Sequence, residues 1–103
     1  MAYKLTITEL ASVDLDEIAG YIMIDLAAPK AAIDFLEAFE VCCTYIKENP
    51  YSYEASRDPR LLAEGYRRAV INNHIMLYKV FPDRKEVVIY RLFYGRREYA
   101  YLI

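Results

Sequence analysis

The carboxy-terminal end of the chain brings arginine and tyrosine side chains together at close spacing. The side chains that could do chemistry there are Arg91, Arg96, Arg97, Tyr99 and Tyr101. Arginine stabilises negative charge on phosphoryl oxygens, and tyrosine can transfer a proton or stack on a base. Both residue types are also enriched at the centres of protein interfaces. The segment therefore predicts contact with a nucleic acid or with another protein.

Other catalytic patterns are weak. The single histidine, His74, falls at the edge of an expected hairpin, where we predict a surface turn residue rather than a catalytic base. Cys42 and Cys43 are adjacent in an expected helix and point about 100° apart, so they predict core filling rather than a disulfide. One histidine and two neighbouring cysteines give no metal-ligand spacing, and isolated glycines give no phosphate-binding loop. We therefore expect no metal and no cofactor.

Charge divides the chain into two halves. Residues 1–55 carry ten acidic and three basic residues, whereas residues 56–103 carry ten basic and five acidic residues, although the net charge is only −2. This asymmetry indicates an interaction face, and the alternative is a mixed surface that only keeps both halves solvated.

Size and composition indicate one domain spanning residues 1–103. A hydrophobic fraction of 56% provides a sizeable core with apolar surface left over, which favours a protein partner or a homodimer. The sequence contains no apolar run long enough for a membrane helix, and its amino terminus lacks a basic-then-apolar signal pattern. We expect a cytoplasmic protein that does not contact a membrane.

Hydrophobic periodicity predicts the elements of the amino-terminal half. Residues 3–8 alternate apolar and polar side chains, as in a half-buried strand. Apolar residues then recur at helical spacing over residues 11–26 and again over residues 32–46, and Pro29 is well placed to begin the second helix. The short connection predicts an antiparallel helical hairpin.

The remaining chain is read as a loop followed by strands. Residues 50–65 show no sustained period, whereas 66–71, 74–81 and 86–94 read as strands joined by turns at Asn72-Asn73 and 82–85. The predicted fold is α+β with the order β-α-α-β-β-β, in which the helical hairpin packs on one face of a mainly antiparallel sheet. The other face would be solvated or covered by a partner, and only the register decides which of Arg67, Arg68 and Arg91 lies there.

Three stretches of the sequence carry a resemblance to a known family. They are 65–68 (Gly-Tyr-Arg-Arg), 77–80 (Leu-Tyr-Lys-Val) and 89–99 (Ile-Tyr-Arg-Leu-Phe-Tyr-Gly-Arg-Arg-Glu-Tyr). With the helical hairpin, they resemble the RelE/ParE superfamily of toxins from bacterial type II toxin–antitoxin systems, which includes plasmid stabilisation proteins. The resemblance implies the same fold and a cognate antitoxin that neutralises the toxin in a hetero-oligomeric complex.

The superfamily has two functional branches. RelE-like members cut mRNA in the ribosomal A site with basic residues on the sheet and a late tyrosine, whereas ParE-like members poison DNA gyrase. By resemblance, Arg67 and Arg97 fall on positions of the nuclease set, but Ile75 replaces its second arginine. The late tyrosine aligns with Ile103, unless Tyr99 or Tyr101 takes its place after a small shift.

The ParE-like branch fits the carboxy-terminal end better. The Arg91…Gly95-Arg96-Arg97 arrangement resembles it, although Tyr94 stands where a histidine often precedes the glycine. A pI near 5.4 also suits entry into a ribosome poorly. We therefore expect a ParE-like gyrase inhibitor that acts by binding, and the alternatives are a metal-independent mRNA interferase and an inactive family member.

Overall fold

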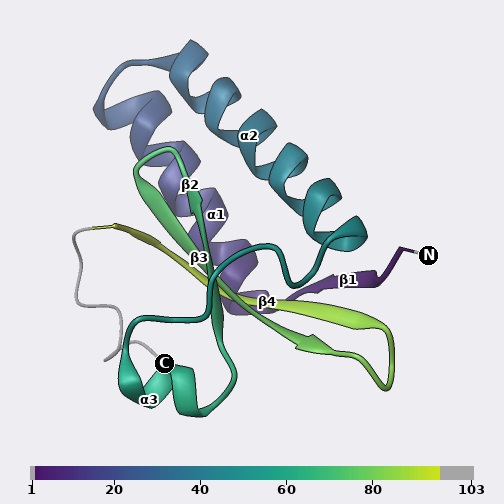
Figure 1. Ribbon diagram of the computed structural model, residues 1–103. Coiled ribbons are helices and arrows are strands. Elements are labelled where there is room, and N and C mark those ends of the chain that lie inside the picture. Colours follow the sequence, from purple (N-terminus) through teal and green to yellow (C-terminus); the bar gives the residue numbers. More distant parts are fainter. Residues whose placement is uncertain (1, 96–103) are drawn as a thin grey trace.

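The computed structural model describes residues 2–95. Its elements, in chain order, are β1 (Lys4–Ile7), α1 (Glu9–Gly20), η1 (Tyr21–Asp25), α2 (Pro29–Glu48), α3 (Pro59–Ala63), β2 (Arg67–Ile71), β3 (His74–Phe81) and β4 (Glu86–Tyr94). The long helices α1 and α2 run side by side as a hairpin, and the strands cross beneath them (Figure 1).

The four strands form one sheet with the order β1-β4-β3-β2. β1 pairs with β4 in parallel, whereas the β2–β3 and β3–β4 pairs are antiparallel. The predicted α+β class, with a helical hairpin on one face of a mainly antiparallel sheet, is confirmed. The two central strands are β3 and β4, and β3 is apolar on both faces, as suits a central strand.

Local sequence chemistry sets the ends of the helices. The Thr8 hydroxyl accepts the Ala11 N–H at 3.1 Å and so caps α1. The helical run continues past Gly20 as the π-helix η1 and ends at Asp25. Pro29 keeps Ala28, the residue before it, out of helical conformation, so the run does not continue into α2. Ala27 takes a left-handed φ of 50° in this turn, and Pro29 lies in the first turn of α2, as predicted.

The main core lies between the helical hairpin and one face of the sheet. Phe35 from α2 and Tyr78 from β3 are almost completely buried there, and the Tyr78 hydroxyl donates a hydrogen bond to the Pro50 carbonyl at 3.1 Å. Cys42 and Cys43 are free thiols that fill the same core, which confirms the prediction made for them. Burial raises the pKa of both thiols, that of Cys43 to about 12.

The opposite face of the sheet differs from the prediction. Residues 50–65 were expected to form only a loop, but they contain α3, which is capped by the Asp58 carboxylate through the N–H groups of Arg60 and Leu61. Leu61 is 0% exposed and packs in a second, smaller core with Phe93 and neighbouring strand residues. This five-residue helix is too short to show a helical period in the sequence. It means that the chain itself covers part of the face we expected to be open.

Candidate functional site

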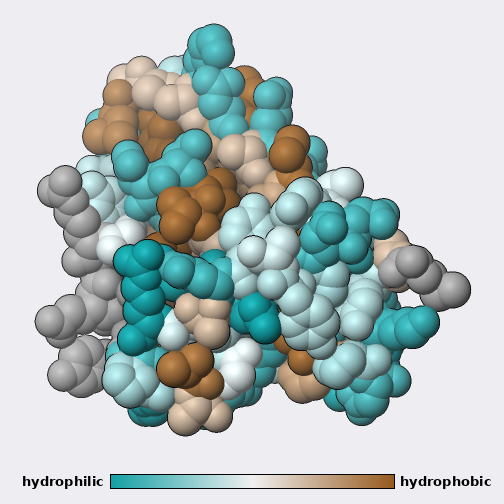
Figure 2. Space-filling model, viewed as in Figure 1, coloured by the Kyte–Doolittle hydropathy of each residue, from teal (hydrophilic) through white to brown (hydrophobic). Residues whose placement is uncertain are grey.

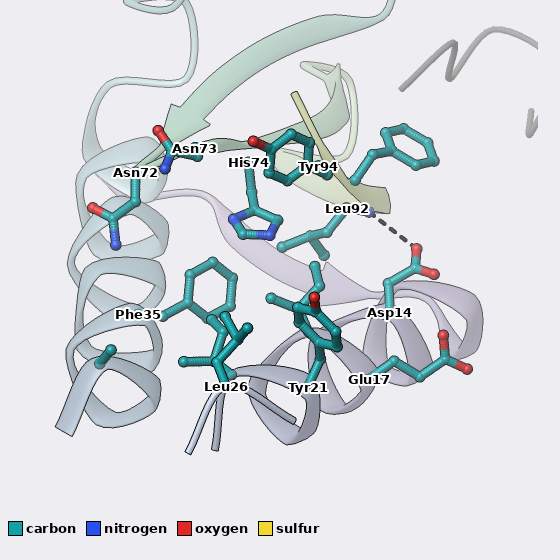
Figure 3. A pocket seen from close by; sticks show the side chains of 14 residues that line it. Asp14, Glu17, Tyr21, Leu26, Phe35, Asn72, Asn73, His74, Leu92 and Tyr94 are labelled. Atoms are coloured by element: carbon teal, nitrogen blue, oxygen red, sulfur yellow. Dashed lines mark hydrogen bonds between the residues drawn. The ribbon is translucent and has the colours of Figure 1, made fainter. Parts of the chain in front are cut away.

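A groove of about 610 Å³ lies between the helical hairpin and the ends of the central strands. Side chains from α1, η1 and α2 form one wall, and the β2–β3 turn with the ends of β3 and β4 forms the other (Figure 3). The residues that line it include Asp14, Glu17, Tyr21, Phe35, His74 and Tyr94. We refer to this hollow as the hairpin groove. Its size is in the range of ligand pockets and of anchor pockets for partner side chains.

One rim of the hairpin groove is fixed by Asp14. Its carboxylate accepts hydrogen bonds from Arg91 Nε at 2.6 Å and Nη2 at 3.1 Å, and from the Leu92 N–H at 3.0 Å. The carboxylate and the guanidinium are both mostly buried. These hydrogen bonds raise the pKa of Arg91 further above its ordinary value.

The geometry of β4 explains this contact. β1 pairs with β4 only as far as Ile89, so the β4 backbone beyond that residue would be left without a neighbouring strand on that side. The Thr8 hydroxyl donates to the Tyr90 carbonyl at 3.0 Å, and Asp14 takes the Leu92 N–H. The side chains of Thr8, which caps α1, and of Asp14 therefore supply hydrogen-bond partners to the backbone at the edge of β4 and hold the helix against it.

His74 begins β3 at the edge of the hairpin, as predicted, but it is not the surface turn residue that we expected. Its side chain is half-buried, with the ring edge-on to Phe35 at 5.0 Å and to Tyr94 at 5.7 Å. Burial lowers its pKa, and within residues 2–95 its buried Nδ1 has no hydrogen-bond partner. Asn72, in the turn just before β3, takes a left-handed φ of 55°, and His74 lines the hairpin groove.

The sheet register settles the orientation of the arginines. Arg67 pairs with Tyr78 and lies on the helix side, where its Nη1 donates to the Tyr53 carbonyl at 2.7 Å and its guanidinium lies over the Tyr51 ring. Arg68 lies on the opposite face and forms an ion pair with Glu54 at 2.7 Å.

Of the candidate site residues, only Arg67 and Arg91 lie within residues 2–95. Arg67 and Arg91 both have partners inside the molecule, so the open arginine rim expected from the sequence does not include Arg91. Arg96, Arg97, Tyr99 and Tyr101 lie outside the described residues. Gly95, which leads into them, donates its N–H to the Asn73 carbonyl at 2.8 Å, and a Cβ there would lie only 3.1 Å from the same oxygen.

A cation on the opposite face was missed by the sequence reasoning. The Lys79 ammonium lies 4.4 Å from the centre of the Tyr66 ring and 5.6 Å from that of Tyr90. Attraction between a cation and aromatic faces holds the ammonium in place there. Only the register of β3 against both β2 and β4 could have revealed the trio, because its members come from three separate segments.

Two further findings bear on the class of protein. Within the described residues, no group of three or more histidine, cysteine, aspartate or glutamate side chains could hold a metal ion. None of the helices in residues 2–95 has the length and apolar character that crossing a membrane would require.

The fold is shared with toxins from solved toxin–antitoxin complexes. The chromosomal ParDE system from P. aeruginosa matches with a TM-score of 0.69 at 21% identity, covering 88% of this chain and 94% of that chain. The RelBE2 complex from Mycobacterium tuberculosis matches with a TM-score of 0.64 at 17% identity, covering 91% and 92%. The RelE–RelB complex from Pyrococcus horikoshii matches with a TM-score of 0.59 at 17% identity, covering 94% and 99%.

The sequence itself gives the family. A family model described as the ParE toxin of the type II toxin–antitoxin system, parDE, matches residues 5–99. A comparison with curated protein sequences gave no significant match. The chain belongs to the ParE toxin family and is a ParE-type toxin of a type II toxin–antitoxin system.

Proposed function

We propose that this toxin inhibits DNA gyrase by binding to it and that a cognate antitoxin neutralises it. The observation that carries the proposal is the ParE family match, which extends over residues 5–99 and so includes Arg96, Arg97 and Tyr99. The solved neighbours are toxin–antitoxin complexes, which supports an antitoxin as partner. We place both events in the cytoplasm, and we expect the toxin to be a homodimer or part of a toxin–antitoxin hetero-oligomer.

We assign target contact to the end of the chain rather than to the sheet. Arg96, Arg97, Tyr99 and Tyr101 follow Gly95, whose backbone hydrogen bond to Asn73 holds the end of β4 against the β2–β3 turn. Arg67 and Arg91 have internal partners, and we give them the role of holding the scaffold in shape. Arginine and tyrosine at the end of a braced strand match the composition of protein-binding hot spots.

Supercoiling of relaxed plasmid by purified gyrase tests the proposal. Micromolar toxin should inhibit the reaction, and a variant carrying Arg96→Glu and Arg97→Glu should lose inhibition by at least about tenfold, because charge reversal at a contact is strongly unfavourable. Lys30→Glu is a matched control, since it reverses a charge on an exposed side chain of α2. If the unaltered toxin does not inhibit gyrase at micromolar concentration, the gyrase proposal is wrong.

A second candidate function is cleavage of mRNA on the ribosome, and the opposite face of the sheet favours it. Arg68, paired with Glu54, and Lys79 place two cations on that face, and the Lys79 ammonium lies beside the rings of Tyr66 and Tyr90. Cations next to aromatic rings suit single-stranded nucleic acid. Primer extension on translated mRNA would reveal cuts at fixed codon positions, and Lys79→Ala should abolish them. Normal growth on overexpression, with neither gyrase inhibition nor mRNA cuts, would identify an inactive member.

A further inference from the structure

The end of β4 lies against the turn between β2 and β3. Tyr94 is paired with His74, the first residue of β3, and their rings lie edge-on at 5.7 Å. Gly95 continues this pairing by one residue, because its N–H donates to the Asn73 carbonyl at 2.8 Å. Figure 3 shows Asn73, His74 and Tyr94 together at this end of the sheet. The turn therefore holds the backbone at the point where residues 2–95 end.

The close approach of Gly95 to the turn favours glycine at this position. A Cβ at position 95 would lie 3.1 Å from the Asn73 oxygen and 3.8 Å from the Asn73 carbonyl carbon. Both atoms belong to the backbone, so neither can move aside as the end of a flexible side chain could. Gly65 takes a left-handed φ of 88°, but Gly95 does not take a positive φ. The lack of space beside Asn73, and not the backbone conformation, is therefore what favours glycine there. A larger side chain would push the end of β4 away from the turn.

The contact between Gly95 and Asn73 lies at the surface, outside both cores. Asn73, Tyr94 and Gly95 are exposed, and Figure 2 shows hydrophilic surface where Figure 1 places the β2–β3 turn. The last core residue of β4 is Phe93, which is 2% exposed. One hydrogen bond at an exposed strand end adds little to stability, since water can replace it. The effect of this contact therefore falls on the residues that follow Gly95 more than on the fold.

We infer that Gly95 is a positioning residue for the segment that follows it. Its hydrogen bond and its close approach to Asn73 set the direction in which the chain leaves the sheet. They thereby set the place from which Arg96 and Arg97 reach the target. Contact groups that are held in place bind without the full cost of ordering them. The inference deepens the proposed function and rests on it in one respect, since it takes these arginines as the target contact.

Gly95→Val separates positioning from strand formation. Valine favours a strand and glycine weakens one, so a position that only extends β4 would gain from this change. We expect instead that Gly95→Val needs about tenfold more toxin for half-inhibition of gyrase supercoiling, at a Tm within about 5 °C of the unaltered toxin. Gly20→Ala is the matched control and should leave inhibition unchanged, because a Cβ at Gly20 meets nothing within 4 Å. Full inhibition by a folded Gly95→Val toxin would overturn the inference.

A serine inserted between Gly95 and Arg96 tests position directly. The insertion leaves residues 2–95 unaltered and moves the following residues by one position, about 3.3 Å in an extended chain. It should weaken inhibition by at least about tenfold, whereas a purely structural role of Gly95 predicts no change. This variant keeps the inference testable even if Gly95→Val does not fold. Inhibition as strong as that of the unaltered toxin would show that the position of the segment does not matter, and the inference would be wrong.

Hydrogen exchange measures the contact itself. The chain contains three glycines, so isotope labelling of glycine alone gives three amide signals. The Gly95 amide should exchange at least about tenfold more slowly than the amide of an unstructured glycine, both in the unaltered toxin and in the insertion variant. A Gly95 amide that exchanges at the unstructured rate would mean that the turn does not hold the end of β4, which contradicts the inference.

Growth arrest on expression separates this inference from the choice of target. If the toxin does not inhibit gyrase, the gyrase proposal is wrong. The inference would still stand if Gly95→Val and the insertion variant lost growth arrest while Gly20→Ala kept it. Equal arrest by the unaltered toxin and all three variants would overturn the inference. A toxin that neither inhibits gyrase nor arrests growth would overturn both proposals.

Discussion

The contact between Asp14 and β4 should be the most sensitive polar contact in the scaffold. Asp14→Ala removes the acceptor of the Leu92 N–H and of two N–H groups of Arg91. A buried backbone donor left without a partner costs about 1–3 kcal/mol. The Arg91 guanidinium is mostly buried, but its side chain remains 17% exposed and can regain part of its hydration, so loss of the ion pair adds about 1 kcal/mol. We expect Asp14→Ala to lower the free energy of unfolding by about 2–4 kcal/mol.

Urea denaturation followed by circular dichroism measures this change. A loss of this size is a large part of the stability of a typical domain, and it corresponds to a fall in Tm of roughly 10–20 °C. Asp16→Ala is the matched control, because Asp16 lies on the exposed side of α1, and it should change stability by no more than about 0.5 kcal/mol.

The two parts of the contact can be separated. Arg91→Ala leaves the Asp14 carboxylate hydrogen-bonded to the Leu92 N–H. It should therefore lower the free energy of unfolding by less than Asp14→Ala does. If Asp14→Ala were as stable as the Asp16→Ala control, the hydrogen bonds at the open edge of β4 would not hold α1 in place, and the scaffolding role given to Arg91 would be refuted.

Three other predictions concern the second core, a helix cap and the thiols. Leu61→Ala should lower the free energy of unfolding by about 2–5 kcal/mol because the side chain is completely buried, whereas Leu62→Ala, at an exposed neighbour, should cost under about 1 kcal/mol in the same urea titration. Asp58→Ala removes the cap of α3 and should cost about 1 kcal/mol. Burial raises the pKa of Cys43 from 9.0 to about 12, so the unfolded chain releases this proton first as the pH rises. Stability conferred by the neutral thiol is complete below pH 9 and should be lost between pH 9 and 12, and a Tm that stays constant up to pH 11 would contradict this.

Much of the fold could be predicted because its signals are local. The helical repeats, Pro29 at the start of α2 and the asparagine turn before β3 each act through neighbouring residues. The helix α3 was missed because five residues do not complete enough turns to show a period. The face on which each β4 side chain lies could not be predicted by counting alternate residues. The register between β3 and β4 shifts between Leu77 and Tyr78, and the alternation of faces along the sequence fails across such an irregularity.

The site could not be predicted to the same extent because its contacts are non-local. Asp14 and Arg91 are 77 positions apart, and nothing in the sequence around either one indicates the other. The hairpin groove likewise forms only when the ends of β3 and β4 reach α1 and α2. The sequence also predicted His74 as a surface residue, because its partial burial depends on a contact with Phe35 from another element.

The parallel pairing of β1 with β4 has a consequence for how the toxin is made. Lys4 lies opposite Glu86, so β1 docks on a strand that is synthesised about 80 residues later. Contacts between such distant positions close a long loop and are slow to form. A nascent chain thus lacks its four-stranded sheet until β4 has been made. A cell that makes the antitoxin first therefore has it waiting when each toxin molecule becomes complete.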